Sequence, residues 1–365
     1  MTTTVLQKPI LVMAGGTGGH VFPALAVAEN LRQRGESVVW LGTRSGIEAR
    51  VVPAADFAIE WLSVQGLRGK GSKTLILAPF RLLRACWQAL RVLRRIRPKA
   101  VLGMGGFVSG PGGLMAWLLD IPLFLHEQNS IIGLTNRLLS RLATRNYFAF
   151  PDAARAMPRS ECIGNPVRAS FADFGDPGAR LQARLESPLQ LLVIGGSLGA
   201  AALNRFLPAA IACLDRDLRP RVRHQCGDRH LQVCQQNYAA AGVDAEVVSF
   251  IEDMPEAYAW ADLVVCRAGA LTLAELGAAG VAALLIPFPY AVDNHQYHNA
   301  RFLESNQAAQ ILLEAELSAE KLALKVKFFQ QNRPALVEMG VNARACFQAD
   351  ATERLATGIL TGART

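Results

Sequence analysis

The sequence predicts an α/β protein with two domains, each built on a doubly wound parallel sheet. Two glycine-rich segments, residues 15–20 and 195–200, carry this prediction because each directly follows a short apolar run. An apolar run that changes to glycines and then to a helical pattern is typical of a buried strand feeding a helix N-terminus, where backbone amides bind phosphate. A chain of 365 residues also exceeds what one hydrophobic core usually supports.

The order of apolar runs and helical patterns predicts the elements of each half. In the first half we expect strands at 10–14, 37–41, 100–102 and 121–125, and helices at 22–34 and 80–97. In the second half we expect strands at 190–194, 221–225, 246–250, 262–266 and 282–286, and helices at 200–214 and 271–279. This alternation is typical of βαβ units on a parallel sheet.

Glycine and proline between the two halves mark the domain boundary. Gly164, Pro166 and the segment 175–178 predict a linker. We therefore expect an N-terminal domain at 1–168 and a C-terminal domain at 169–341. The segment 342–365 reads as a lone helix, which we expect to pack back on the N-terminal domain.

The composition favours a well-folded protein with anionic partners. Hydrophobic residues make up 51% of the chain, and the net charge is +8, which favours phosphates, nucleic acid or an anionic membrane surface. Seven cysteines without a CxxC pair predict reduced, cytosolic thiols rather than disulfides or a zinc site. No stretch approaches the roughly 18 apolar residues that predict a membrane span.

The glycine loops differ from those of nicotinamide-binding proteins. Val21 and Ala201 stand where the GxGxxG pattern needs its last glycine. The predicted strand at 37–41 is followed by residues 42–44, Gly-Thr-Arg, and not by the acidic residue that binds ribose in such proteins. Nicotinamide binding is therefore the weaker interpretation.

Polar groups at the carboxyl edge of the first predicted sheet are candidate catalytic residues. His20 closes the first glycine loop, where its imidazole either takes a proton from an attacking hydroxyl or only forms a local hydrogen bond. The segment 126–129, His-Glu-Gln-Asn, follows another predicted strand at the same edge. In the glycine-rich segment 103–113, the amides of Gly105 and Gly106 are candidates for binding a second anionic group, which two such loops in one domain suggest is a diphosphate.

The second half offers candidate ligand-binding groups. The segment 267–275 predicts a helix N-terminus aimed at the ligand crevice of the second sheet. Glu275 on it either holds ribose hydroxyls or forms a capping box with Thr272. Arg168 and Ser197 are either phosphate contacts or ordinary solvated and capping residues.

Two patterns that suggest a metal are weak. His295 and His298 form an HxxH pair without a third acidic ligand at helical spacing. Asp215 and Asp217 match a DxD motif but follow a helical pattern, which favours a solvated helix end. We therefore predict no obligatory metal.

A basic segment lies between Trp61 and Leu119, where the chain has no acidic residue. On the predicted helix at 80–97, an apolar face that we expect to face the core lies opposite Arg84, Arg91 and Arg95. That apolar face contains Leu82, Leu83, Cys86, Leu90, Leu93 and Ile96. A solvated basic face and nucleic-acid binding are the alternatives to membrane binding, which we favour because aromatic residues are not interleaved with the charges.

Six motifs, in order along nearly the whole chain, resemble those of the MurG family of bacterial glycosyltransferases. They are GGTGGH at 15–20, GMGGFVSGPG at 103–112, HEQN at 126–129, GNPVR at 164–168, GGS at 195–197 and RAGALTLAE at 267–275. The resemblance implies the GT-B fold, in which two Rossmann-like domains face a cleft. It places the acceptor in the N-terminal domain and the sugar donor in the C-terminal one.

The resemblance also implies an activity and its partners. Enzymes of this family invert the anomeric centre as they move N-acetylglucosamine from UDP-N-acetylglucosamine to the C4 hydroxyl of undecaprenyl-diphospho-N-acetylmuramoyl-pentapeptide. The acceptor is called lipid I and the product lipid II, a precursor of peptidoglycan. The implied partners are UDP-N-acetylglucosamine, lipid I, an anionic membrane surface and other cell-wall synthesis and division proteins, with no nucleic acid and no cofactor. The implied location is the cytoplasmic face of the bacterial inner membrane, as a peripheral protein.

The resemblance assigns roles to individual residues. It places uracil near Ile251, ribose at Glu275, and the phosphates at Ser197 and the amides of helix residues 270–272. Further matches to donor contacts are Thr17, Gly18, Gly19, Asn129, Arg168, Ala270, Leu271, Thr272, Leu273, Ala274 and Gln296.

For catalysis, His20 is the first candidate base and Glu127 the second. Ala268 and Ala274 stand where the family often has serine, and His295 where it has glutamine. The rival functions are a UDP-sugar epimerase and a non-enzymatic basic adaptor.

Overall fold

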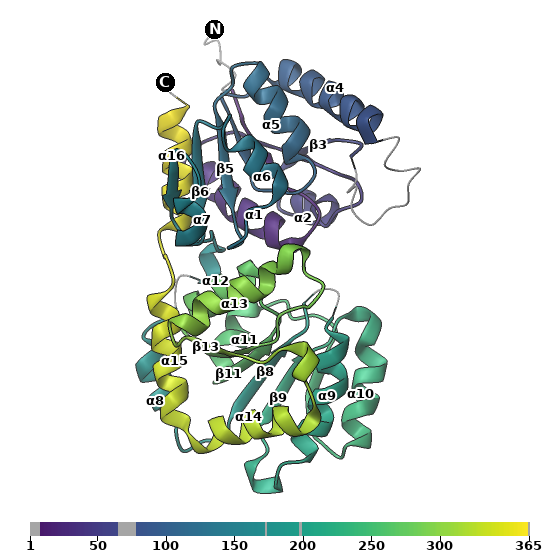
Figure 1. Ribbon diagram of the computed structural model, residues 1–365, viewed down its shortest axis with the longest axis vertical. Helices are drawn as coiled ribbons and strands as arrows, with labels where there is room; N and C mark the ends of the chain where they lie inside the picture. The colour runs from purple at the N-terminus through teal and green to yellow at the C-terminus, as the bar shows by residue number, and fades with distance from the viewer. Residues whose placement is uncertain (1–7, 65–77, 172–173, 197–198, 364–365) are drawn as a thin grey trace. The chain divides into compact units, whose positions relative to one another are not determined.

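A computed structural model describes residues 8–64, 78–171, 174–196 and 199–363 of the chain (Figure 1). The chain forms two compact units: unit 1 comprises residues 1–169 and 348–365, and unit 2 comprises residues 170–347. The first boundary thus falls one residue beyond the expected one. The expected lone helix from residue 342 is two helices, because residues up to Ala345 finish a helix of unit 2 and a new helix of unit 1 begins at Ala351.

Unit 1 is built on a seven-stranded parallel sheet in the order β3-β2-β1-β4-β5-β6-β7. Its strands are β1 Ile10–Met13, β2 Val38–Gly42, β3 Ala58–Trp61, β4 Ala100–Gly103, β5 Leu123–Glu127, β6 Arg145–Phe148 and β7 Ser160–Cys162. The chain runs outward from β1 in one direction and then from β4 in the other. In such a sheet, ligands bind at the carboxyl ends of the strands where the order reverses, here β1 and β4.

Helices cover both faces of this sheet. They are α1 Gly18–Gln33, α2 Glu48–Ala54, α4 Ala78–Ile96, α5 Ser109–Leu118, α6 Leu134–Leu139, α7 Pro151–Arg155 and α16 Ala351–Gly362. The C-terminal helix α16 contacts α1 and buries Leu355, Ala356 and Ile359 in the same core cluster as Ile10 and Val12. This burial fixes the end of the chain to unit 1.

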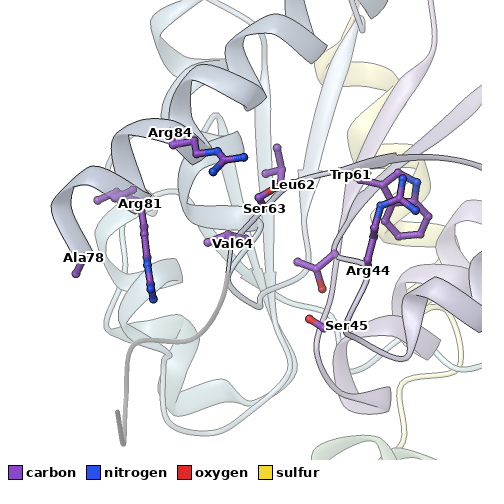
Figure 2. Close-up of a pocket in the computed structure, with 11 residues that line it drawn as sticks. Arg44, Ser45, Trp61, Leu62, Ser63, Val64, Ala78, Arg81 and Arg84 are labelled. Carbon is purple, nitrogen blue, oxygen red and sulfur yellow. The ribbon is translucent and has the colours of Figure 1, made fainter. Parts of the chain in front are cut away.

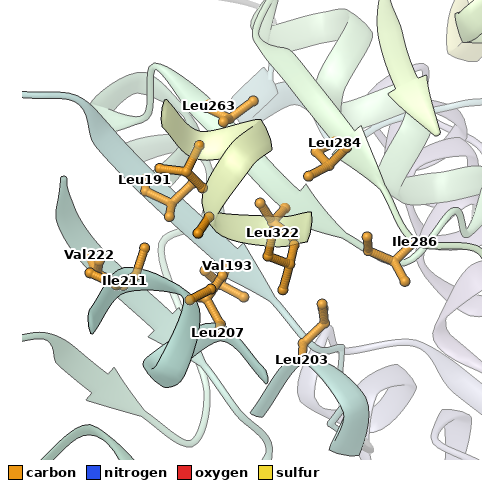
Figure 3. Close-up of a cluster of buried hydrophobic side chains, with 14 of the residues drawn as sticks. Leu191, Val193, Leu203, Leu207, Ile211, Val222, Leu263, Leu284, Ile286 and Leu322 are labelled. Carbon is orange, nitrogen blue, oxygen red and sulfur yellow. The ribbon is translucent and has the colours of Figure 1, made fainter. Parts of the chain in front are cut away.

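Unit 2 is built on a six-stranded parallel sheet in the order β10-β9-β8-β11-β12-β13. Its strands are β8 Gln190–Ile194, β9 Arg221–Gln225, β10 Glu246–Val248, β11 Leu263–Cys266, β12 Ala282–Leu285 and β13 Ala309–Ile311. Its helices are α8 Pro177–Gln182, α9 Ala201–Ala212, α10 Leu231–Ala240, α11 Met254–Trp260, α12 Ala270–Ala279, α13 His295–Ser305, α14 Ala319–Gln331 and α15 Arg333–Ala345. Figure 3 shows the core, where Val193 of β8 lies among Leu203 and Leu207 of α9 and Leu322 of α14.

The expected strands form with ends shifted by at most two residues, but four others were missed: β3, β6, β7 and β13. Each of these has three or four residues and contains polar or half-exposed positions, so no apolar run marks it. β3, β6 and β13 pair through the backbone with the expected strands β2, β5 and β12, and β7 pairs with β6. Tertiary pairing, and not local pattern, therefore defines them.

Candidate active site

The first glycine loop joins β1 to the N-terminus of α1 in unit 1. Gly16 has a φ of +96°, in the left-handed region that favours glycine, and it is exposed like Thr17. Thr17 is the N-cap of α1, and its side chain caps no amide. Gly18, Gly19 and His20 form the first turn of the helix, so their amides point toward the loop, where an anion is stabilised.

A buried carboxylate that the sequence did not reveal holds this loop in shape. The Glu48 side chain, fully buried at the start of α2, accepts hydrogen bonds from the Gly16 N–H at 3.0 Å, the Thr43 N–H at 2.9 Å and the Thr43 hydroxyl at 2.7 Å. A Cβ on Gly15 would lie 2.6 Å from the Glu48 Oε1 atom. The loop therefore needs glycine partly because Glu48 occupies the space beside it.

A second glycine segment packs against the first at the carboxyl end of β4. Gly105 and Gly106 have φ values of +94° and +81°. A Cβ on Gly105 would lie 2.8 Å from the His20 ring, and one on Gly106 would overlap the Gly15 carbonyl oxygen. The segment expected as a glycine loop over 103–113 is shorter than expected, because α5 begins at Ser109. Gly105 and Gly106 remain in the loop beside His20.

His20 is hydrogen-bonded into unit 1 through the segment that follows β5. Its Nδ1 atom lies 2.8 Å from the Gln128 Oε1 atom, and the Gln128 amide contacts the buried His126 ring. The His126 Nε2 atom lies 2.9 Å from the Gly164 carbonyl oxygen. Burial is the main cause that lowers the pKa of His126, to about 4, so this ring is neutral at physiological pH.

Glu127, the second candidate base, is engaged in holding the loop that follows it. Its carboxylate is 3% exposed and accepts hydrogen bonds from the Asn129 and Gly133 backbone amides at 3.1 and 3.0 Å. The Asn136 side chain donates to the same carboxylate at 2.9 Å. This geometry favours a structural role, and His20 is the better candidate base.

Two other predicted donor contacts lie in unit 1. Asn129 donates from its backbone and its side chain to Glu127. The Arg168 guanidinium lies 5.7 Å from the centre of the Phe22 ring on α1, so Arg168 is held beside the helix that carries His20.

The second glycine loop follows β8 in unit 2. Gly196 and Gly199 have φ values of +79° and +74°. A Cβ on Gly199 would overlap the Cys226 carbonyl oxygen, so the chain passes close to β9 before α9 begins. Ser197 lies outside the described residues, and its phosphate contact stays a prediction.

The helix α12 carries most of the predicted donor contacts. Gly269 is its N-cap, which leaves the first-turn amides of residues 270–272 directed out of the helix end after β11. Glu275, one turn further, is 8% exposed and accepts a hydrogen bond from the Tyr258 hydroxyl at 3.1 Å. The alternative of a capping box is wrong, because the N-cap is Gly269 and Thr272 lies inside the helix. Leu273 is buried on the core side, so its backbone is the part of it that a ligand can contact.

Gln296 joins two loops at the same edge of the second sheet. Its Oε1 atom accepts hydrogen bonds from the backbone amides of Ala268 and Phe288, at 3.2 and 2.9 Å. Among the described residues, none accepts from its Nε2 atom, which is the part left for a ligand. The His295 Nδ1 atom lies 2.7 Å from the Val292 carbonyl oxygen, so this ring caps the turn before α13. Ile251 lies half-buried between β10 and α11.

Within the described ranges, no group of three or more His, Cys, Asp or Glu side chains is arranged to hold a metal ion. Asp217 lies in a short 3-10 turn, Arg216–Leu218, of which Asp215 is the N-cap.

The basic helix α4 packs most of the expected face against the core, where Leu93 is buried and Cys86, Leu90 and Ile96 are partly buried. Ala85, Ala89, Val92 and Leu93 are buried, whereas Leu82 and Leu83 are exposed. The neighbouring large side chains Phe80 and Trp87 are 70% and 56% exposed, and Trp117 and Leu118 of the adjacent α5 are also exposed. The expectation fails only toward the start of α4, where Leu82 and Leu83 face outward together with Phe80 and Trp87.

Aromatic residues are interleaved with the charges of α4, contrary to the expectation. The Arg91 guanidinium lies 4.7 Å from the centre of the Trp87 ring, and Phe80 precedes Arg81. The absence of aromatics therefore fails as the reason for preferring a membrane. Membrane binding is instead favoured by the exposed apolar surface of α4 and α5, because soluble proteins seldom expose so many large apolar side chains together.

A cavity beside α4 was also missed from the sequence. It has a volume of about 420 Å³ and lies at the carboxyl ends of β2 and β3 (Figure 2). Arg44, Arg81 and Arg84 line it, and Arg44 lies along Trp61 with 5.0 Å between the guanidinium and the ring centre. The three arginines make the cavity suited to an anionic group.

Known proteins match this chain over nearly its whole length. Residues 10–148 match the glycosyltransferase family 28 N-terminal domain and residues 190–355 its C-terminal domain. A relative from Alkalilimnicola ehrlichii is 54% identical, covering 98% of this chain and 100% of the relative, and one from Nitrosococcus oceani is 54% identical, covering 95% and 96%. Both are named UDP-N-acetylglucosamine--N-acetylmuramyl-(pentapeptide) pyrophosphoryl-undecaprenol N-acetylglucosamine transferase.

A solved structure agrees with these relatives. The crystal structure of Acinetobacter baumannii MurG matches with a TM-score of 0.83 and 41% sequence identity, covering 97% of this chain and 99% of that one. This likeness confirms the expected GT-B fold with two Rossmann-like domains.

Proposed function

The chain belongs to glycosyltransferase family 28, and we propose that it transfers N-acetylglucosamine from UDP-N-acetylglucosamine to undecaprenyl-diphospho-N-acetylmuramoyl-pentapeptide. The observation that carries this function is 54% identity to a transferase of that name over nearly the full length of both chains. A fold alone does not imply a function, so the proposal also requires the matching side chains at the site.

The donor half of the proposed site is formed by unit 2. Glu275 is held by Tyr258 at 3.1 Å, and we assign its carboxylate to the ribose hydroxyls. The first-turn amides of α12 meet the diphosphate, whose charge grows as UDP leaves. The helix N-terminus supplies the positive potential for the leaving group, and this proposal needs no metal ion.

The acceptor half is formed by unit 1. The C4 hydroxyl of the acceptor attacks the anomeric carbon, the bond to the UDP oxygen breaks, and the hydroxyl proton passes to His20. A one-step displacement of this kind inverts the anomeric centre and needs a base beside the hydroxyl. Gly105 lies beside the His20 ring and Gly106 beside Gly15, and we assign the amides of both glycines to the acceptor diphosphate.

Membrane attachment is proposed through α4 and α5. Burying a large apolar side chain contributes about 1.5–3 kcal/mol, and each basic group near an anionic surface about 1 kcal/mol. Phe80 and Trp87 with the arginines of α4 supply both contributions on one helix. No helix in the described part of the chain is long and apolar enough to cross a membrane. We place the protein on the cytoplasmic face of the inner membrane, where its nucleotide-sugar donor is found.

A ligand panel tests the donor assignment. Thermal unfolding is measured with UDP-N-acetylglucosamine, UDP, UDP-glucose and NAD, since a ligand at 100 times its dissociation constant stabilises by about 2.7 kcal/mol. We expect stabilisation by UDP-N-acetylglucosamine and UDP and none by NAD. Stabilisation by NAD alone, or by none of the four, would contradict the proposal. Conversion of the donor without any acceptor would favour the epimerase instead.

The base assignment is tested by His20→Ala, with His298→Ala as a matched control on an exposed histidine of α13. A general base contributes about 10²–10⁴-fold. We expect kcat to fall within that range for His20→Ala and to stay within about twofold for the control. Near-normal turnover of His20→Ala with unchanged acceptor affinity would mean that another group takes the proton.

A further inference from the structure

A continuous set of hydrogen bonds runs from the backbone of unit 1 to His20. It starts at the Gly164 carbonyl oxygen, which lies 2.9 Å from the His126 Nε2 atom. A carbonyl oxygen only accepts hydrogen bonds, so the His126 Nε2 atom must carry a proton. Gly164 itself is held in place: its φ is +80°, and a Cβ there would lie 2.6 Å from the Cβ of Gln348.

The second hydrogen bond of the set is made by the neutral His126 ring. His126 is fully buried, so at physiological pH it carries a single ring proton, the one on Nε2. Its Nδ1 atom is therefore an acceptor, and it lies 3.2 Å from the Gln128 Nε2 atom. The same Nε2 atom lies 3.2 Å from the His126 carbonyl oxygen, which also only accepts. Two acceptors thus fix the orientation of the Gln128 amide, with its NH₂ group toward His126.

The third hydrogen bond joins Gln128 to His20, the candidate base. With the amide fixed, the Gln128 Oε1 atom faces His20 and lies 2.8 Å from the His20 Nδ1 atom. An amide oxygen only accepts, so neutral His20 carries its proton on Nδ1 and has its lone pair on Nε2. No described residue bonds to the His20 Nε2 atom.

We propose that Gln128 and His126 are positioning residues that hold His20 in the tautomer with the proton on Nδ1, so that Nε2 is the atom that takes the acceptor proton. Without this constraint a neutral imidazole populates both tautomers, and only one of them presents a lone pair at Nε2. The hydrogen-bond constraint stands on the geometry alone, and its catalytic meaning rests on the proposed function.

The tautomer is measured directly by nuclear magnetic resonance on the full chain labelled with ¹⁵N-histidine. The chain has six histidines, and His20→Ala assigns the signal of interest. In the absence of ligands, at a pH where the ring is neutral, we expect a pyrrole-like Nδ1 and a pyridine-like Nε2 for His20. The reverse pattern, or an even mixture, would overturn the proposal.

Two substitutions of Gln128 distinguish a role in positioning His20 from a role in stabilising the fold alone. Gln128→Met keeps the length of the side chain but has no acceptor, whereas Gln128→Glu keeps an oxygen toward His20. We expect Gln128→Met to lose the Nδ1–H preference and to lower kcat, by no more than the 10²–10⁴-fold that a general base contributes, with the donor KM within about twofold. Gln128→Glu keeps the acceptor toward His20 and should keep the Nδ1–H preference. Part of the loss of kcat should remain, because its second oxygen faces the two acceptors of His126. Equal loss of kcat in both variants with an unchanged tautomer would refute the proposal.

The matched control is Asn146→Ala. Asn146 of β6 is 1% exposed and donates to the Ser140 and Pro158 carbonyl oxygens, so its loss perturbs packing without touching His20. The wild-type spectrum, assigned with His20→Ala, needs no variant of Gln128, so it decides the question even where Gln128→Met fails to fold. It also needs no substrate: the expected tautomer in a protein without transferase activity would contradict the proposed function and leave the tautomer assignment intact.

Discussion

Substitution of Glu48 should destabilise the first glycine loop, and the loss in free energy of unfolding should depend on which carboxylate oxygen is removed. Two of its three hydrogen bonds go to the buried Thr43, and the third goes to Gly16, which is exposed. A hydrogen bond to a charged acceptor contributes about 1.5–3 kcal/mol. Because the two bonds to the buried Thr43 are both lost, Glu48→Ala should lower the free energy of unfolding by roughly 3–6 kcal/mol. Glu48→Gln keeps the oxygen that faces Thr43 and should cost about 1 kcal/mol, because water replaces the bond to Gly16.

Denaturant unfolding followed by tryptophan fluorescence measures this difference. Four of the five tryptophans, at positions 40, 61, 87 and 117, lie in unit 1, so the signal reports mainly on the unit that contains Glu48. The control is Glu353→Ala, which removes a carboxylate that is 72% exposed and pairs with Arg34, and it should cost less than about 1 kcal/mol. If Glu48→Ala were no more destabilising than this control, the proposed support of the loop would be refuted.

Three further outcomes follow from the same geometry. Tyr258→Phe removes the donor that orients Glu275 and should weaken UDP binding about fivefold in calorimetry, as expected for a hydrogen bond of about 1 kcal/mol; unchanged affinity would contradict that role. Burial lowers the pKa of His126 to about 4 and of His224 to about 3, from 6.5, so the unfolded chain binds these protons first as the pH falls and stability is lost below pH 6.5. Urea unfolding at pH 5 and pH 7 should differ by about 2 kcal/mol for each histidine, and equal stability at the two pH values would exclude this cause. Replacing both Phe80 and Trp87 with serine should lower binding to anionic vesicles by tenfold or more while leaving turnover of a water-soluble acceptor unchanged; undiminished binding would move the membrane surface elsewhere.

The central strands and glycine loops could be predicted from the sequence because local signals define them. Buried parallel strands such as β1 and β8 are continuous apolar runs, and each loop needs glycine where φ is positive. The edge strand β7 has no such signal, since its residues are polar and its position comes from pairing with β6. The core face of α4 was predicted correctly at Leu93 but not at Leu82 and Leu83, because helical spacing identifies an apolar face but does not say over what length that face meets the core.

In the candidate site, too, some residues could be predicted from local motifs and others only from the fold. Motifs identified His20 and Glu275, whose residue types stand next to recognisable loops. Glu48 was missed because a lone glutamate at the start of a helix resembles any solvated residue until the fold brings Gly16 to it. The tautomer of His20 depends on the Gly164 carbonyl, 144 positions away, and no local pattern carries that information.

The most direct test of the central claim is a transfer assay with labelled UDP-N-acetylglucosamine and undecaprenyl-diphospho-N-acetylmuramoyl-pentapeptide in anionic vesicles, with the lipid product identified by mass spectrometry. The proposed function predicts one N-acetylglucosamine added to the acceptor through a β-1,4 linkage, with stoichiometric release of UDP. A lipid fraction that stays unmodified while the protein binds the donor would contradict it.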